Sequence, residues 1–192
     1  MVLGIIGKVG SGKSTVVKYL QKEYRAIYFS CDKIAKLIIA EKKINLNHFN
    51  LGELFTNKNV QEEVRAVLHK EVFNRIFLYI NYLMNKYNKN NLLNKNNYSE
   101  LLIIIESALP NDDMFKMCDK MIYVRSSFED RAERLQSSRE YTIEKTKLIS
   151  DAQDYYEKFY DRADYCIDNN GTKEDLLKKV KEVIDEIYIV SK

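Results

Sequence analysis

A glycine-rich segment that begins at the seventh residue constrains this chain more than any other feature. Its letters, GKVGSGKST, match the phosphate-loop pattern G-x-x-x-x-G-K-S/T and stand between an apolar run and a helical pattern, as that loop requires. Backbone N–H groups in such a loop surround a β-phosphate, the lysine reaches the β- and γ-oxygens, and the serine hydroxyl binds magnesium. The alternative is a glycine turn with a chance Lys-Ser pair. We expect a nucleotide site formed by Gly7, Val9, Gly10, Ser11, Gly12, Lys13, Ser14 and Thr15.

Short apolar runs alternate along the chain with longer segments of helical spacing, which is typical of helices packed around a parallel sheet. The runs rich in β-branched residues predict strands at residues 2–6, 26–30, 101–105, 121–125 and 165–168. The sequence therefore predicts an α/β fold with a doubly wound, five-stranded parallel sheet. It would be a P-loop NTPase fold similar to that of nucleoside monophosphate kinases.

Apolar residues at helical spacing predict three helices. The sets are Val60, Val64, Leu68, Val72 and Ile76, then Ile143, Leu148, Ile149, Ala152, Tyr155 and Phe159, and finally Leu176, Val180, Val183 and Ile187. The middle set is less regular and has charged flanks, so it predicts either a lid or an ordinary surface helix. Residues 85–99 are mostly Asn, Lys and Tyr and predict a long loop or a poorly ordered helix extension.

The chain of 192 residues has the usual size of a single domain. We expect a core at about 1–32, 96–133 and 156–192 and a lid at about 134–155. Between the first two parts of the core we expect a helical insertion at about 33–95, which would bind the acceptor of a phosphoryl group taken from the nucleotide.

Composition argues against several classes of partner. The 31 basic and 28 acidic residues give a net charge of +3 that is spread along the chain, so we expect no nucleic-acid partner. Cys31, Cys118 and Cys166 lack the spacing of a disulfide framework or a zinc site and favour a reducing cytoplasm. No apolar run approaches the ~20 residues that span a bilayer, and no targeting segment is expected before the loop. We expect a cytoplasmic protein with no membrane partner, monomeric or weakly homo-oligomeric.

Two carboxylates follow predicted strands. Asp32 comes after the strand at 26–30, so it lies at the carboxyl edge of the sheet, where ligands bind in doubly wound folds. It would either accept the proton of an acceptor hydroxyl or cap a helix that begins at Lys33. Glu106 follows the strand at 101–105, where it would hold a magnesium-bound water or be a simple strand-end acid.

Several stretches resemble motifs of the dephospho-CoA kinase family. The letters GSGKST resemble its glycine-rich loop, CDKIA around Asp32 is similar to its A-D-x-I-A motif, and Leu68-His69 resembles its L-H-P. Arg134-Leu135 resembles its lid-entry R-L. The letters ADYCIDNNGT, which contain Asn170 and Gly171, resemble its closing A-D-x-x-I-D-N-N-G-S, and Gln153 stands at the expected distance before them. The resemblance spans nearly the whole chain.

The resemblance implies transfer of a phosphoryl group from ATP, with Mg²⁺, to the ribose 3′-hydroxyl of dephospho-coenzyme A. It implies that Asp32 is the catalytic base, that His69 helps to bind the acceptor, and that Asn170 and Gly171 lie near the adenine. By chemistry alone these last two residues predict a turn. Arg134 and Arg139 would neutralise charge on the transferred group or would lie on a solvated helix face.

Departures from the family pattern fall on the acceptor side. The interval between Asp32 and His69 is shorter than the family usually has, and Lys70 stands where the family has proline. The P-L-L-F-E segment is represented only by residues 107–112, and the second lid arginine is displaced by one, to Arg139. Two alternatives therefore stay open: a kinase of a nucleoside or nucleoside monophosphate, and a non-catalytic nucleotide-binding protein derived from a kinase.

Overall fold

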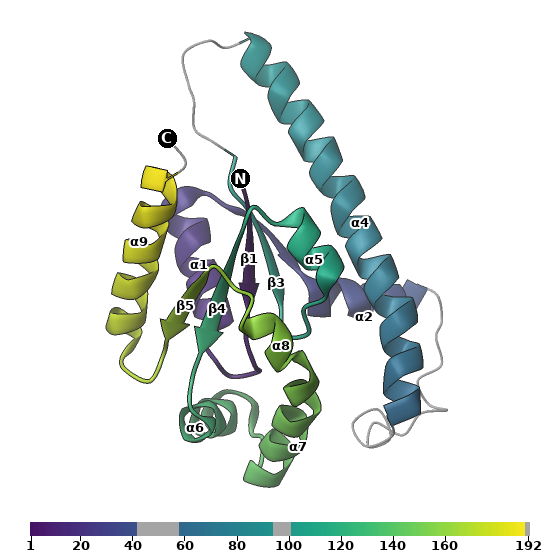
Figure 1. Ribbon diagram of the computed structural model, residues 1–192, viewed down its shortest axis with the longest axis vertical. Coiled ribbons are helices and arrows are strands. Elements are labelled where there is room, and N and C mark those ends of the chain that lie inside the picture. The colour runs from purple at the N-terminus through teal and green to yellow at the C-terminus, as the bar shows by residue number, and fades with distance from the viewer. Residues whose placement is uncertain (42–57, 94–100, 191–192) are drawn as a thin grey trace.

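The protein, described here by a computed structural model, is built on a parallel sheet with helices on both faces (Figure 1). The structure describes residues 1–41, 58–93 and 101–190, with side chains described at 1–41, 68–87 and 101–189. The sheet has five strands in the order β2-β3-β1-β4-β5, all parallel. The strands are β1 (Val2–Ile6), β2 (Ile27–Ser30), β3 (Ile103–Ser107), β4 (Lys120–Arg125) and β5 (Tyr165–Asp168). All five predicted strands are confirmed.

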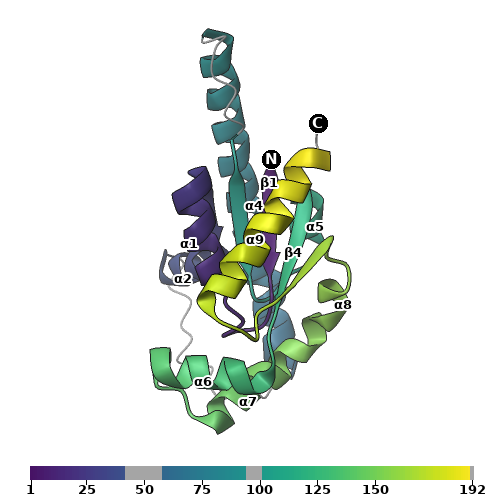
Figure 2. The same ribbon diagram turned by 90° about the vertical axis from the view of Figure 1, so that its left-hand side faces the viewer.

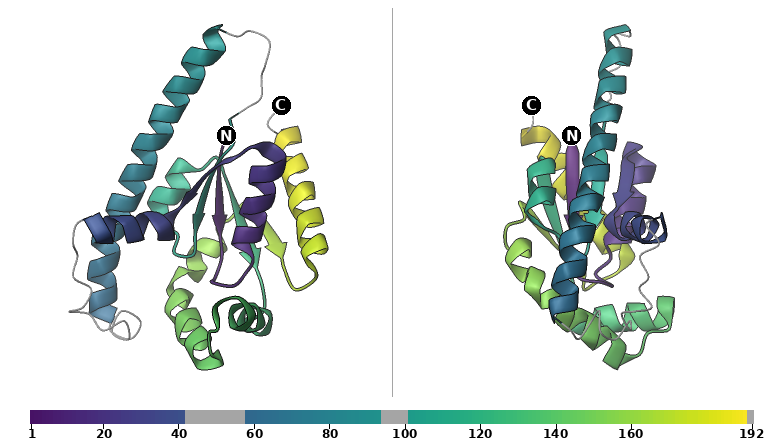
Figure 3. Two further views of the ribbon diagram at one scale, coloured as in Figure 1. Left: turned by 180° about the vertical axis from the view of Figure 1, so that it is seen from behind. Right: turned by 90° about the vertical axis from the view of Figure 1, so that its right-hand side faces the viewer.

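Helices α1 (Lys13–Tyr24) and α9 (Lys173–Val190) cover one face of the sheet (Figure 3). The other face is covered by α4 (Lys58–Leu93), α5 (Asp112–Met117) and α8 (Glu157–Tyr160) (Figure 2). Because successive side chains of a strand point to opposite faces, Leu3 and Ile5 of β1 pack with the first group, and Val2 and Ile6 with the second. Both faces of the sheet are therefore buried under helices, which explains why the strands are continuous apolar runs.

The helix predicted from Val60 to Ile76 is the first part of α4, whose 36 residues span about 54 Å at 1.5 Å per residue. Its described apolar side chains Val72 and Ile76 are buried against the sheet, and its far end extends past the sheet in Figure 1. The helix continues through half of the predicted Asn-rich segment, to Leu93. Residues 42–57 and 94–100, which include parts of the predicted insertion, lie outside the described residues.

Beside α4, α2 (Cys31–Glu41) packs across its middle turns, and the Glu41 carboxylate lies 2.7 Å from a nitrogen of Arg75. The same guanidinium contacts Glu71 one turn earlier on α4, at 3.3 Å. These contacts fix α2, and so the residues at its first turn, against the long helix.

Two helices, α6 (Phe128–Arg139) and α7 (Ile143–Gln153), lie beyond the carboxyl ends of the strands (Figure 1). Ser127 and Thr142 cap them, because their hydroxyl oxygens accept the backbone N–H of Asp130 and Lys145. The 3₁₀ turn η2 (Asp154–Tyr156) separates α7 from α8, so the helix predicted over 143–159 is broken.

The predicted apolar face of that helix is wrong. Ile143, Leu148 and Tyr155 are more than half exposed, whereas Thr146, Ser150 and Gln153 are buried. The reason is the surface on which α7 lies: Gln153 accepts a hydrogen bond from the loop at Val9, and Ser150 accepts one from Arg131. A polar helix face is buried here because its partner is polar.

No helix in the described ranges is long and apolar enough to cross a membrane.

We expect Ile105→Ala to lower the free energy of unfolding by about 2–5 kcal/mol, because Ile105 is fully buried between the sheet and α4. Ile189→Ala is the matched control, since that side chain is 75% exposed on α9, and its effect should stay below about 0.5 kcal/mol. Urea unfolding followed by circular dichroism measures both. Equal effects would contradict the assignment of this face of β3 to the core.

Candidate functional site

The edge strand β2 and the inner strands β3 and β1 are neighbours in the sheet, and their carboxyl ends lie side by side. Ile6 pairs with Ser107, and Ser30 pairs with Glu106. The phosphate loop leaves β1 at Gly7, and α2 begins directly after Ser30. Glu106 lies within β3, whereas the sequence predicted it just after the strand. The sheet therefore brings the loop, the first turn of α2 and Glu106 to one edge.

Two glycines of the loop stand where a side chain would not fit. Gly12, the residue before α1, has φ 102°, and a Cβ there would lie 2.2 Å from the side-chain nitrogen of Asn169. Gly10 has φ 81° and lies against α6, where a Cβ would be 3.0 Å from both the carbonyl oxygen of Arg131 and the side chain of Leu135. The loop is thus shaped by left-handed backbone and by close neighbours.

Contacts from distant segments hold the loop. Asn169 is buried after β5 and donates from Nδ2 to the carbonyl oxygen of Ser11 at 2.8 Å. The side-chain oxygen of Gln153 accepts the N–H of Val9 at 3.0 Å. Lys8 Nζ bridges Asp154 and Glu157, at 2.5 and 2.9 Å, and these contacts raise its pKa although burial acts against them. The loop is tied to both the closing segment and the end of α7.

Lys13 is the buried cation of the site. It is 6% exposed, and its Nζ donates to the carbonyl oxygens of Gly7 at 2.9 Å and Lys8 at 3.2 Å. Glu106 Oε1 lies 3.9 Å from the same nitrogen. Burial lowers the pKa of Lys13, the charges of Glu106 and Asp32 act to raise it, and the guanidinium groups of Arg139 and Arg131 act to lower it further. Two acids and two arginines therefore act electrostatically on this ammonium.

The two candidate carboxylates have different surroundings. Glu106 is mostly buried and accepts a 2.5 Å hydrogen bond from the Tyr28 hydroxyl, and burial together with that bond raises the pKa of Tyr28. Asp32 is exposed in the first turn of α2. The helix begins at Cys31, and the hydroxyl of Ser30 accepts the N–H of Lys33 at 3.4 Å, so the alternative that Asp32 caps a helix beginning at Lys33 is wrong.

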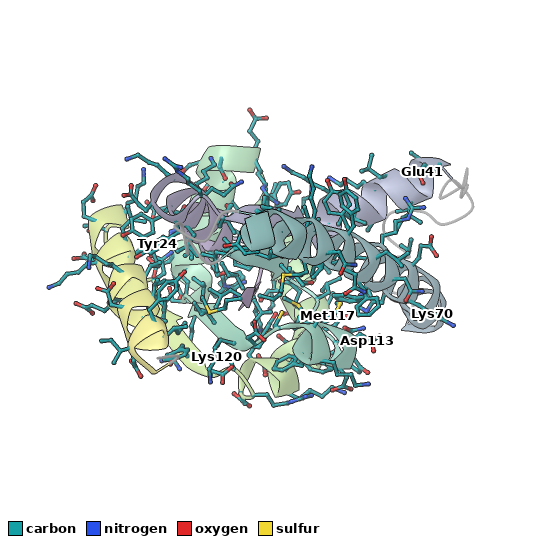
Figure 4. All side chains as sticks on the ribbon, turned by 90° about the horizontal axis from the view of Figure 1, so that it is seen from above. Tyr24, Glu41, Lys70, Asp113, Met117 and Lys120 are labelled. Carbon is teal, nitrogen blue, oxygen red and sulfur yellow. The ribbon has the colours of Figure 1, made fainter. Side chains whose placement is uncertain are left out.

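Asp32 borders a cavity of about 120 Å³ between α2, α4 and the end of β3. His69 and Phe73 of α4 line both this cavity and a second, open one of about 730 Å³ between α4, α5 and the η2–α8 segment. Figure 4 labels three residues that line the larger cavity, Lys70 on α4 and Asp113 and Met117 on α5. The acid at the sheet edge therefore lies on a cavity that shares His69 and Phe73 with a large groove.

The two predicted arginines, Arg134 and Arg139, differ in the contacts that they make. Arg134 donates to the Ser126 hydroxyl and to the carbonyl oxygen of Asn169, both at 2.9 Å, so it ties α6 to the closing segment. Arg139 is exposed at the end of α6, where its guanidinium lies 6.0 Å from the Tyr141 ring centre. Asn170 accepts the N–H of Ser127, and Gly171 follows it in the turn before α9.

The oxygen donors near the loop suit a hard divalent cation. Ser14 is exposed in the first turn of α1, and Glu106 and Asp32 lie at the same sheet edge. Among residues 1–41, 58–93 and 101–190, no group of three or more His, Cys, Asp or Glu side chains gathers as a metal site. Mg²⁺ commonly takes only one or two protein ligands beside phosphate oxygens and waters, so this donor set fits it.

Comparison with known proteins identifies the family. The model of the dephospho-CoA kinase family matches residues 1–175. A dephospho-CoA kinase from Fusobacterium nucleatum is 29% identical, over 97% of this chain and 98% of its own length. The chain belongs to the dephospho-CoA kinase family. This confirms the predicted kinase function in coenzyme A biosynthesis, and with it the transferase class.

Solved structures agree on the fold. The protein TT1252 from Thermus thermophilus superposes with a TM-score of 0.68 at 23% identity, covering 97% of each chain. A dephospho-CoA kinase from Campylobacter jejuni gives a TM-score of 0.56 at 20% identity, over 100% of this chain and 98% of that one. The predicted P-loop kinase fold is confirmed.

Some site residues of this family member were not predicted. Asn169 stands beside the predicted Asn170 and holds the loop, but only its burial and its hydrogen bond to Ser11 show which of the two asparagines turns inward. Arg131 is 4% exposed beneath α7 and has no motif around it. Both Arg131 and Arg134 stand among other charged residues of α6, so the sequence does not indicate that one of these arginines is buried.

We expect Lys13→Met to abolish stabilisation by ATP without lowering the stability of the nucleotide-free protein. Because the pKa of Lys13 is lowered on folding, its charge is a penalty at neutral pH that decreases as the pH rises toward the unfolded value of about 10.4. The gain in the variant should therefore shrink at alkaline pH.

Thermal unfolding with and without ATP measures this, with Lys18→Met, an exposed lysine of the same helix, as the control. Wild-type protein should gain about 2.7 kcal/mol at an ATP concentration 100 times Kd, and the control should match it. An ATP response retained by Lys13→Met would contradict the assigned role.

Proposed function

We propose that this chain transfers the γ-phosphoryl group of ATP to the ribose 3′-hydroxyl of dephospho-coenzyme A. The observation that carries the proposal is the juxtaposition of Asp32 and Lys13 at one sheet edge, next to a cavity that shares His69 and Phe73 with a large groove. Donor and acceptor would meet between these two side chains.

The ATP side would be formed by the loop and the closing segment. Backbone N–H groups of the loop and the N-terminus of α1 surround the β-phosphate, and Lys13 exchanges its loop carbonyls for β- and γ-oxygens. The turn at Asn170 and Gly171 would border the adenine, since Arg134 and Asn169 fix that turn against α6 and the loop.

Magnesium would be held by Ser14 directly and by Glu106 through water. When bound, Mg²⁺ neutralises negative charge on the β- and γ-phosphates. Glu106 is suited to an indirect contact because its carboxylate is already engaged by Tyr28 and lies 3.9 Å from Lys13.

The acceptor would occupy both cavities. Its ribose would lie at Asp32 in the smaller one, with His69 at the passage, and its diphosphate and extended arm would follow the larger groove. The lining of that groove includes the cations Lys70, Lys116 and Lys158, which suit a diphosphate, the acids Asp112 and Asp113, and the rings of Phe73 and Phe77, which suit the apolar parts of the arm. Its volume of about 730 Å³ lies within the range of small-molecule sites.

Transfer would proceed by in-line displacement. The 3′-oxygen forms a bond to the γ-phosphorus while the bond from that phosphorus to the bridging oxygen breaks, and ADP leaves. Asp32 orients the hydroxyl and accepts its proton. The segment at 134–155, which comprises the second half of α6 and most of α7, would act as a lid that excludes water and so favours transfer over hydrolysis.

The remaining expectations belong with this proposal. An enzyme of coenzyme A biosynthesis with three cysteines in the free thiol form fits a cytoplasmic location. A monomer or weak homo-oligomer, with neither nucleic acid nor membrane as partner, stays a prediction.

We expect Asp32→Asn to lower kcat for dephospho-coenzyme A by about 10²–10⁴-fold, the usual contribution of a general base, with little change in ATP affinity. Asp185→Asn on α9 is the control, because that exposed carboxylate pairs only locally, with Lys181. Coupled measurement of ADP release gives kcat and KM. Wild-type turnover by Asp32→Asn would remove Asp32 from the mechanism.

A further inference from the structure

Arg131 is a buried cation whose donors are largely unused. Its side chain is 4% exposed on α6, and its Nη2 donates to the hydroxyl of Ser150 on α7 at 3.0 Å. Its Nε and Nη1 have no hydrogen-bond partner in the described part of the chain, and no ion pair found there includes it. An Arg side chain so buried is normally paired with a carboxylate.

The surroundings of Arg131 supply weak compensation. Its guanidinium lies 5.6 Å from the Phe128 ring centre, and Asp154, whose charge also reaches it, is already bound by Lys8. Burial lowers the pKa of Arg131, because removing the guanidinium from water disfavours its charged form. Such an uncompensated charge destabilises a fold, so its presence calls for a partner that the described residues do not provide.

The position of Arg131 indicates the charge of that partner. Its own carbonyl oxygen lies so near Gly10 of the phosphate loop that a Cβ there would be 3.0 Å away, and its charge acts on Lys13. Two further buried groups lack a partner among the described residues, the hydroxyls of Ser11 in the loop and Thr146 on α7. Unused donors on the loop and on both helices that cover it suit a ligand rich in acceptor oxygens, such as a triphosphate.

We propose that Arg131 is a catalytic residue whose guanidinium donates to the γ-phosphoryl group of bound ATP and stabilises that group during transfer. The proposal rests on the proposed function, in which the γ-phosphorus exchanges its bond to the bridging oxygen of ADP for one to the acceptor oxygen. Arg131 forms and breaks no covalent bond, and its Nε and Nη1 stabilise charge on the equatorial oxygens.

This role falls to Arg131 rather than to Arg134, which the sequence favours. Arg134 already donates hydrogen bonds to Ser126 and to the backbone of Asn169. Arg131 lies on the inner face of α6, and two of its nitrogen donors have no partner among the described residues. Ser150 holds Arg131 from α7, so closure of that helix over the loop would move the guanidinium together with the lid.

The test compares Arg131→Gln and Arg131→Lys with Arg25→Gln, which removes an exposed arginine just after α1, at the opposite end of the sheet. We expect kcat with dephospho-coenzyme A to fall about 100-fold or more in Arg131→Gln, the usual cost of one such donor. Arg131→Lys should recover part of it, and Arg25→Gln should match wild type. Turnover by wild-type protein tests the proposed function itself, separately from the variants.

A second readout needs neither turnover nor the acceptor. ADP with aluminium fluoride mimics the transferred group, and it should raise the melting temperature of wild-type protein beyond the effect of ADP alone. Arg131→Gln should lose that additional increase while responding normally to ADP, and its melting temperature without ligand should equal or exceed that of wild type.

Two outcomes would overturn the proposal. One is a kcat within about threefold of wild type in Arg131→Gln, which is too small a change for a transition-state contact. The other is a lower melting temperature without ligand together with an unchanged response to ADP and aluminium fluoride, which would make Arg131 a link between α6 and α7 and nothing more.

Discussion

The burial of Lys13 inside its own loop is the constraint on which the rest of the site depends. An ammonium that is 6% exposed needs oxygen partners, and the loop supplies the carbonyl groups of Gly7 and Lys8 while Glu106 lies close by. Glycines at positions 7, 10 and 12 adopt the positive φ angles that this loop requires. Asn169 and Gln153 then fix the loop from two other segments. A bound triphosphate would replace these partners with stronger ones.

The same arrangement explains why the fold could be predicted from the sequence and part of the site could not. Apolar strands that are buried on both faces leave an unambiguous pattern, and the loop motif fixes the strand and helix around it. The face of α7 could not be predicted, because Thr146, Ser150 and Gln153 are buried for the sake of a polar neighbour that hydrophobic periodicity ignores. The start of α2 was misplaced by two residues, because Ser30 and not Asp32 provides the cap.

For the acceptor side the sequence proposed Asp32 and His69, but it could not predict the cavity that both of them line. Asp32 and His69 belong to helices far apart in the chain, and only the packing of α2 against α4 brings them to one cavity. The large groove beside them is lined from three separate segments. Its lysines and aromatic rings support an acceptor with a diphosphate and a long arm.

Dephospho-coenzyme A is the proposed acceptor, and ATP consumption by purified protein with Mg²⁺ tests this when that acceptor is compared with a panel of nucleosides and nucleoside monophosphates. We expect turnover with dephospho-coenzyme A, with ADP formed in equal amount to coenzyme A. Tight binding of ATP without turnover of dephospho-coenzyme A, or preferred turnover of a nucleoside, would contradict it.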